Sequence, residues 1–81
     1  MSQVNNNFAR EILAKNVFKL RIKANLGKEE LSLLLGFDNS YISKLEKSKI
    51  NITIDKIQII ANYFNVCIKD LFDYWKYLLL R

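Results

Sequence analysis

Apolar residues recur with the period of an α-helix along most of the chain. In the first such stretch the apolar positions follow one another at i, i+4, i+7 and i+11, and they are Leu13, Val17, Leu20 and Ala24. A later stripe of the same kind consists of Ile57, Ile60, Ala61 and Phe64, widened by Ile59 and Tyr63. The pattern predicts five helices, at residues 8–25, 28–35, 39–47, 54–63 and 68–80.

The stretch from Lys28 to Lys47 is predicted to form two short helices joined by a tight turn. Its first eight residues contain neither Pro nor Gly and are dense in helix-forming residues. Gly36 comes next, where a left-handed backbone can end the helix at little cost. Asp38 is expected to cap the following helix, since its carboxylate can accept backbone N–H groups. The residues expected to bury here are Leu31, Leu35, Phe37, Ile42 and Leu45.

Residues that favour helix ends support the remaining boundaries. Thr53 is suited to cap the fourth helix with its hydroxyl, and Asn65 tolerates the left-handed backbone that closes it. Gly27 is a weaker cap for the second helix, because it has no side-chain acceptor. Leu33 and Leu34 are adjacent in that helix, and we expect one of them either to be exposed or to be covered by the amino-terminal end of the chain.

The last predicted helix carries more apolar surface than a domain of this size needs at its end. Leu71 and Phe72 are assigned to the core of the monomer. A further exposed patch with an aromatic residue is typical of an interface. The predicted members of that interface are Trp75, Leu78 and Leu79.

Length and charge fit one helical domain, residues 1–81, with an anionic partner. The chain is 51% hydrophobic, yet a domain of 81 residues buries only ~60–65% of its unfolded surface, so association would add stability. The absence of Pro favours helices with short connections. Thirteen Lys and Arg against eight Asp and Glu give a net charge of +5 and a pI near 9.5, which favours binding to an anion.

The residue types present exclude several kinds of site. With no His and one Cys, zinc sites, Cys–His nucleophiles and intramolecular disulfides are excluded. No pair of carboxylates stands out as an acid–base site, so we expect no enzyme activity, no metal and no cofactor. Cys67 lies between Val66 and Ile68 and is expected to be a small buried side chain, not a reactive thiol.

Neither end of the chain suggests a membrane. Residues 1–7 are polar, include three consecutive Asn and are expected to be flexible. They hold no Arg or Lys with which a flexible arm would contact an anionic partner. No signal-peptide pattern is present, and the apolar run Leu78–Leu80 is too short to span a bilayer. We therefore expect a cytoplasmic protein without a membrane partner.

The stretch Lys28–Lys47 resembles the helix-turn-helix of the Cro and phage-repressor (Xre-type) family of DNA-binding regulators. The match comprises the small residue Ser32 where the helices cross, Gly36 in the turn, and the string Tyr41-Ile42-Ser43-Lys44-Leu45-Glu46. It extends over roughly residues 17–72. The resemblance implies an all-α, five-helix, lambda-repressor-like domain that binds double-stranded DNA; with no ligand-sensing domain present, no small-molecule ligand is expected.

The resemblance implies that residues 39–47 and their neighbours contact the DNA and recognise its sequence. A recognition helix points its N-terminal side chains at base edges in the major groove, where Asn can pair with adenine and Lys can donate to guanine. The predicted base contacts are Asn39, Ser40, Ser43 and Lys44. The predicted backbone contacts are Lys28, Tyr41, Lys47, Lys49 and Asn51. The alternative is that these residues form only the polar face of an amphipathic helix.

The resemblance also implies an ion pair and a dimer. An arginine at the position of Arg21 pairs, in this family, with the glutamate that corresponds to Glu46. In the same family the final helix pairs about a twofold axis, so residues 68–81 are expected to form a dimerisation helix. A homodimer of that kind sets two recognition helices ~34 Å apart and requires a palindromic operator.

Within the family, the sequence is most similar to the controller proteins of restriction–modification systems. The similarity lies in residues 38–43 followed by Asn51-Ile52-Thr53-Ile54. Three alternatives remain open: a repressor of a phage or mobile element, an antitoxin, and a protein-interaction module that does not read DNA sequence. Transcriptional regulation by occupancy of an operator is the preferred function.

Overall fold

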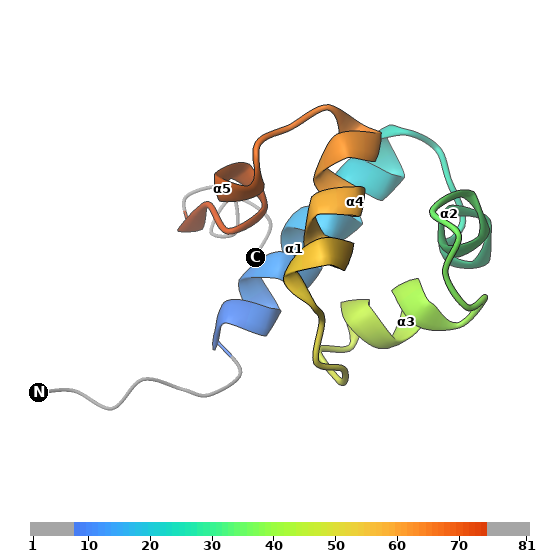
Figure 1. Cartoon of the computed structure of the whole chain (residues 1–81), viewed down its shortest axis with the longest axis horizontal. Helices are drawn as coiled ribbons and strands as arrows, with labels where there is room; N and C mark the ends of the chain where they lie inside the picture. Colours follow the sequence, from blue (N-terminus) through green and yellow to red (C-terminus); the bar gives the residue numbers. More distant parts are fainter. Residues whose placement is uncertain (1–7, 75–81) are drawn as a thin grey trace, which may run out of the picture.

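A computed structural model describes residues 8–74 of the chain, and these residues form an all-helical fold with no strand. The helices within this range are α1 (Phe8–Lys23), α2 (Lys28–Leu34), α3 (Tyr41–Glu46), α4 (Ile54–Phe64) and α5 (Ile68–Leu71). Figure 1 shows α1 and α4 in the middle of the molecule, with α2 and α3 toward one end and α5 toward the other. The predicted fold class is therefore confirmed.

All five helices contribute to one core. Its fully or almost fully buried members are Leu13, Val17, Leu31, Ile42, Leu45, Ile57, Ile60, Ala61 and Leu71. Ala24 does not belong to it, although the helical stripe predicted that it would. The chain leaves α1 after Lys23, because Asn25 adopts a left-handed φ of 59°, and Ala24 is exposed in that turn.

The predicted helix ends at three positions are confirmed. Gly36 has a φ of 77° after α2, and Asn65 has φ 56° and ψ 45° after α4. The hydroxyl of Thr53 accepts a hydrogen bond from the backbone N–H of Lys56 at 3.2 Å, as an N-cap does. Gly36 therefore marks the end of α2, and Thr53 and Asn65 mark the two ends of α4.

The prediction of one continuous helix from Ile68 to Leu80 is wrong, because α5 ends at Leu71. The amide group of Asn16, in α1, donates to the carbonyl of Leu71 at 2.9 Å and to that of Asp73 at 3.3 Å. Asn16 is buried, so these bonds satisfy the terminal carbonyls from inside the fold. Phe72 leaves the helical backbone with φ −113° and packs on the core, as predicted. Trp75, Leu78 and Leu79, like residues 1–7, lie outside the described residues.

Several apolar side chains are more exposed than the sequence predicted. Leu33 and Leu34 are both exposed, at 61% and 54%, because the buried face of α2 consists of Leu31 and Ser32. Ile59 and Tyr63 are also exposed and do not widen the stripe of α4.

Cys67 is exposed, contrary to the prediction that it is buried. It lies in an extended segment with φ −78° and ψ 152°, where successive side chains point to opposite sides. Val66 and Ile68 pack on the core, so Cys67 points outward.

Candidate nucleic-acid interface

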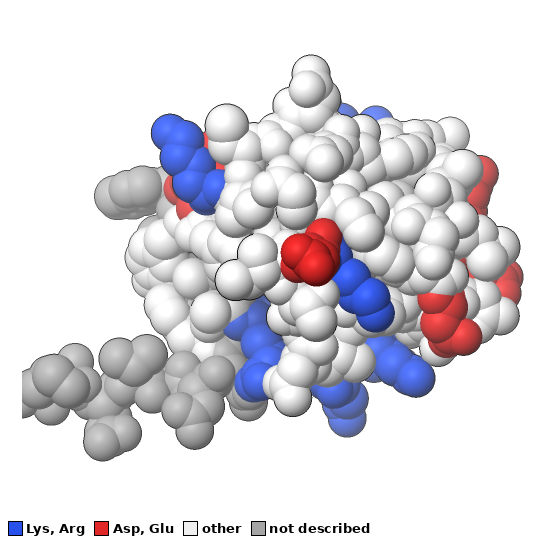
Figure 2. Space-filling view, viewed as in Figure 1, with Lys and Arg blue, Asp and Glu red and all other residues white. Residues whose placement is uncertain are grey.

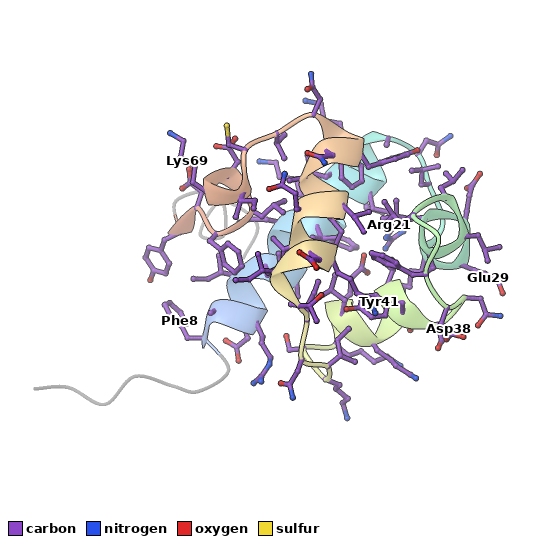
Figure 3. All side chains as sticks on the ribbon, viewed as in Figure 1. Phe8, Arg21, Glu29, Asp38, Tyr41 and Lys69 are labelled. Atoms are coloured by element: carbon purple, nitrogen blue, oxygen red, sulfur yellow. The ribbon has the colours of Figure 1, made fainter. Side chains whose placement is uncertain are left out.

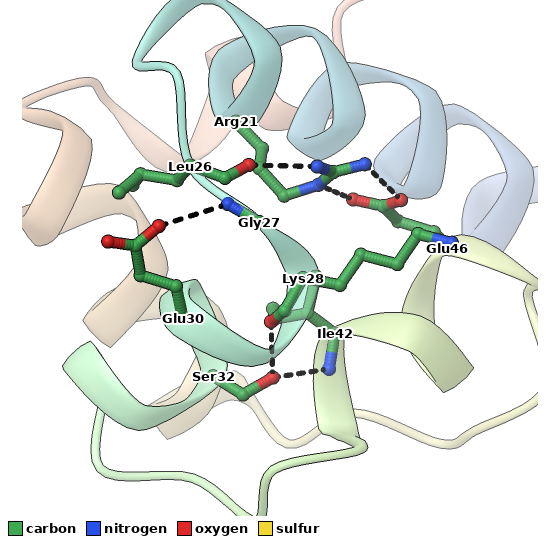
Figure 4. Close-up of polar contacts among 8 residues, drawn as sticks. All are labelled: Arg21, Leu26, Gly27, Lys28, Glu30, Ser32, Ile42 and Glu46. Carbon is green, nitrogen blue, oxygen red and sulfur yellow. Dashed lines mark hydrogen bonds and ion pairs between the residues drawn. The ribbon is translucent and has the colours of Figure 1, made fainter.

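The N-terminal end of α3 is fixed to α2 through the buried hydroxyl of Ser32. This hydroxyl accepts from the backbone N–H of Ile42 at 3.0 Å and donates to the carbonyl of Lys28 at 2.9 Å (Figure 4). The first backbone N–H groups of a helix have no partner within it, so Ser32 supplies one from a neighbouring helix. The small residue predicted for the helix crossing thus also bonds to the helix that it contacts.

The C-terminal end of α3 is fixed to α1 by the ion pair between Arg21 and Glu46. The guanidinium donates to the two carboxylate oxygens at 2.7 and 3.0 Å, in a bidentate arrangement (Figure 4). A third guanidinium N–H donates to the carbonyl of Leu26 at 2.9 Å. The two side chains are only 7% and 9% exposed. Both ends of α3 are therefore held from within the fold, while its outer face stays open.

The chain before α3 forms a turn that is held by acidic side chains. Helix α3 begins at Tyr41, two residues later than predicted, and Asn39 and Ser40 belong to the turn. The carboxylate of Asp38 accepts from the Ser40 hydroxyl at 2.6 Å and from the Ser40 backbone N–H at 3.2 Å. These bonds, the hydroxyl one first, hold the pKa of Asp38 below its usual value. The prediction that Asp38 caps the following helix is therefore wrong: the N-cap residue of α3 is Ser40, and because the helix begins only at Tyr41, the Asp38 carboxylate bonds the turn before it.

The four predicted base-contact residues lie in this turn and on α3. Asn39 and Lys44 are exposed, and Ser40 and Ser43 are half-buried. The amide of Asn39 donates to the carboxylate of Glu29 at 3.2 Å. Asn39 and Ser40 therefore have acidic partners in the free protein, and either would have to exchange that partner to bond a base.

Tyr41 differs from its predicted role as a backbone contact. Its ring faces α4 (Figure 3), 4.7 Å from the ring of Phe37, and the ammonium of Lys56 lies 4.6 Å from its centroid. Its hydroxyl is buried and has no hydrogen-bond partner, and desolvation raises its pKa. A hydroxyl in that position does not reach a phosphate, so we leave Tyr41 out of the contacts proposed below.

Positive side chains surround the exposed face of α3. Lys44, Lys47 and Lys49 are exposed on α3 and the loop after it, and Lys28 is exposed at the start of α2. Figure 2 shows Lys and Arg side chains along the lower edge of the molecule, where α3 and this loop lie, whereas acidic side chains lie toward α2 and in the middle of the face. Asn51 is exposed in the same loop. This distribution of charge suits a polyanion lying across α3.

The sequence analysis missed Arg10 as a neighbour of this face. The guanidinium of Arg10, in the first turn of α1, donates to the side-chain oxygen of Asn51. The bond occupies the amide oxygen of Asn51 and so fixes which way its amide points. No local signal could have revealed it, because the two residues are 41 positions apart.

The described part of the chain offers neither a membrane span nor a metal centre. Among residues 8–74, no helix has the length and apolar character to cross a bilayer. Over the same residues, no group of three or more His, Cys, Asp or Glu is arranged to hold a metal ion.

Comparison with known proteins gives consistent matches. A family model described as helix-turn-helix matches residues 17–71. Control protein C.SmaI of Serratia marcescens is 34% identical over 62 residues, which span 76% of this chain and 74% of that protein. Control protein C.BamHI of Bacillus amyloliquefaciens is 30% identical over 69 residues, spanning 84% of this chain and 85% of that protein.

Two solved structures are similar to this fold, each at 25% sequence identity. A hypothetical transcription factor, NHTF, from Neisseria superposes with a TM-score of 0.79 and covers 100% of this chain and 95% of its own. The restriction-modification controller protein C.AhdI from Aeromonas hydrophila superposes with a TM-score of 0.71, covering 78% of this chain and 96% of its own.

Proposed function

The chain belongs to the helix-turn-helix (Xre-type) family of DNA-binding regulators, and from that premise we propose that it binds a palindromic operator as a homodimer and controls a restriction–modification system. The relatives are named as control proteins and a transcription factor, not as enzymes. We take residues 1–81 as one domain, and the family match lies within it.

The observation that carries the proposal is the fixed position of α3. Ser32 bonds its first turn and Arg21 bonds its last, and both attachments are buried. A helix that is held at both ends keeps its exposed side chains in a set geometry, which readout of base edges requires. A helix whose polar face is merely solvated would not need such attachments.

The contacts that we propose divide into base and backbone contacts. Lys44 and Ser43 extend from α3 itself and are suited to base edges, with Asn39 and Ser40 joining them after release from Glu29 and Asp38. The backbone contacts are Lys28, Lys47, Lys49 and Asn51, which are all exposed around α3. Contacts of the second kind supply most of the affinity and make it depend on salt.

The homodimer rests on family resemblance and on the size of the domain. A chain of 81 residues buries a modest share of its surface, and pairing would bury more. We keep Trp75, Leu78 and Leu79 as the proposed interface. Twofold pairing would separate the recognition helices by ~34 Å and so match an inverted repeat.

The test is selection of bound fragments from a randomised DNA pool at near-physiological salt, followed by sequencing. An enriched inverted repeat supports a dimeric operator-binding regulator. Its presence upstream of this protein's own gene, beside an endonuclease gene, supports the controller role over a phage repressor or an antitoxin. No enriched sequence would overturn the proposal in favour of a protein-interaction module.

A further inference from the structure

A hollow lies beside α3, where α1 and the start of α2 meet the end of the recognition helix. Its volume is about 210 Å³. The apolar residues that line it are Ala14 and Phe18 of α1, and the guanidinium carbon of Arg21 lies 5.3 Å from the Phe18 ring centroid. The polar residues that line it are Lys15, Lys28, Ser43, Glu46 and Lys47.

The charges around this hollow favour an anion. Lys15, Lys28 and Lys47 are exposed and come from three different helices or helix ends. Glu46 is the acidic residue of the lining, and both of its carboxylate oxygens accept hydrogen bonds from Arg21. Its charge is thus compensated within the fold, and the three ammonium groups give the hollow a positive potential.

The position of the hollow, beside α3, points to a phosphate of the DNA backbone as the anion. Ser43 and Lys47 line it from α3, and Lys44, adjacent in sequence to Ser43, is a proposed base contact. When α3 lies in a major groove, the sugar–phosphate backbone that borders the groove passes beside the helix. We propose that this hollow seats a backbone phosphate and that Lys15 of α1 is a DNA-binding residue that acts with Lys28 and Lys47.

This inference rests on the proposed function and extends the interface to α1. Lys15 precedes the helix-turn-helix by more than a dozen residues, so the resemblance of residues 28–47 carries no information on it. Because a phosphate has the same charge in every sequence, Lys15 should contribute equally to operator and random DNA.

The experiment compares Lys15→Ala with Lys23→Ala, a matched change in charge on the same helix. Lys23 is exposed at the end of α1 and lines a different hollow, beside Val66 and Asp70. Binding is measured over a series of salt concentrations on two duplexes of equal length, the repeat enriched by selection and a random sequence. Circular dichroism and thermal unfolding of each variant check that it is folded.

Loss of one phosphate contact should reduce the slope of log K against log salt by about 0.9, which corresponds to roughly fivefold weaker binding at physiological salt. We expect this loss for Lys15→Ala on both duplexes, and recovery in Lys15→Arg. Lys23→Ala should keep the slope of the unaltered protein. Equal slopes for Lys15→Ala and Lys23→Ala would overturn the inference.

A second measurement locates the phosphate. Each phosphate along the repeat is replaced in turn by a neutral methylphosphonate, and binding is compared for the unaltered protein, Lys15→Ala and Lys28→Ala. One position should weaken the unaltered protein and have little effect on either variant. If no position depends on Lys15, the hollow does not seat a phosphate. The random duplex keeps the two proposals distinct, since it reports on Lys15 even if selection yields no operator.

Discussion

The backbone N–H of Ile42 donates a hydrogen bond to the buried hydroxyl of Ser32 at 3.0 Å, so a side chain of α2 satisfies the first turn of α3. The helix-turn-helix is thereby joined by a polar bond as well as by apolar packing. Because the bond is buried, its loss leaves a donor without water or protein to bond it.

Ser32→Ala should lower the free energy of unfolding by ~1–3 kcal/mol, the cost of leaving the Ile42 N–H buried and unsatisfied. Urea denaturation measures this change. The matched control is Ser43→Ala, since Ser43 is half-buried on α3, and its change should stay within about 0.5 kcal/mol. Equal stability of the two variants would show that the Ser32 bond contributes little.

Arg21→Met should destabilise the protein by ~3–5 kcal/mol, because Glu46 would remain buried with an uncompensated charge. The double variant Arg21→Met with Glu46→Leu should recover most of that loss, since apolar side chains can replace a buried ion pair. Lys23→Met, an exposed change on the same helix, is the control for charge. A double variant as unstable as Arg21→Met would contradict this account.

Tyr41→Phe should raise the free energy of unfolding by about 1 kcal/mol at neutral pH, because it removes a buried hydroxyl that has no partner. The raised pKa of Tyr41 also makes stability depend on alkaline pH. The unfolded chain releases this proton near pH 10.0, before the folded protein does, so stability is full below that pH and falls as pH rises through the folded pKa.

Denaturation at neutral and alkaline pH tests both parts of this prediction. Tyr41→Phe should lack the loss of folding stability at alkaline pH that the Tyr41 hydroxyl causes. Tyr63→Phe, at an exposed position, should change the free energy of unfolding at neutral pH by less than about 0.5 kcal/mol. DNA binding by Tyr41→Phe should match that of the unaltered protein. A large loss of DNA affinity would instead return Tyr41 to the backbone contacts.

Gly36→Ala and Ser48→Gly should change stability in opposite directions. Gly36 has a φ of 77°, and an added Cβ would meet no atom within 4 Å, so the whole cost of ~1–2 kcal/mol is conformational. Ser48 has a φ of 59°, which Gly adopts freely, so Ser48→Gly should stabilise by up to about 1 kcal/mol. Thermal unfolding of both variants in one buffer decides this, and a shift of the same sign in both would contradict it.

Lys44→Ala and Lys49→Ala should separate base readout from backbone binding. Loss of Lys44 should cost ~1–3 kcal/mol on the selected operator and relax preference at one base position. Loss of Lys49 should weaken binding to all sequences and lower the salt slope by about one. Both variants are tested on operator and random duplexes; equal losses on the two duplexes for both would remove Lys44 from the base contacts.

The sequence by itself determined the helices and most of their ends. Gly36, Thr53 and Asn65 act through the backbone of their own neighbours, so their effects can be predicted from a few residues. The spacing of Leu13 and Val17, and of Ile57, Ile60 and Ala61, likewise predicted which faces form the core. The Arg21–Glu46 pair is present as the family resemblance implied.

Only the tertiary structure decided the features that depend on distant residues. Asn16 bonds the last residue of α5 across 55 positions of sequence, and Arg10 bonds Asn51 across 41. The burial of the Tyr41 hydroxyl follows from the packing of its ring toward α4 and Phe37. Local patterns specify a helix and its apolar face, but the orientation of a polar side chain is set by whichever donors and acceptors the fold brings beside it.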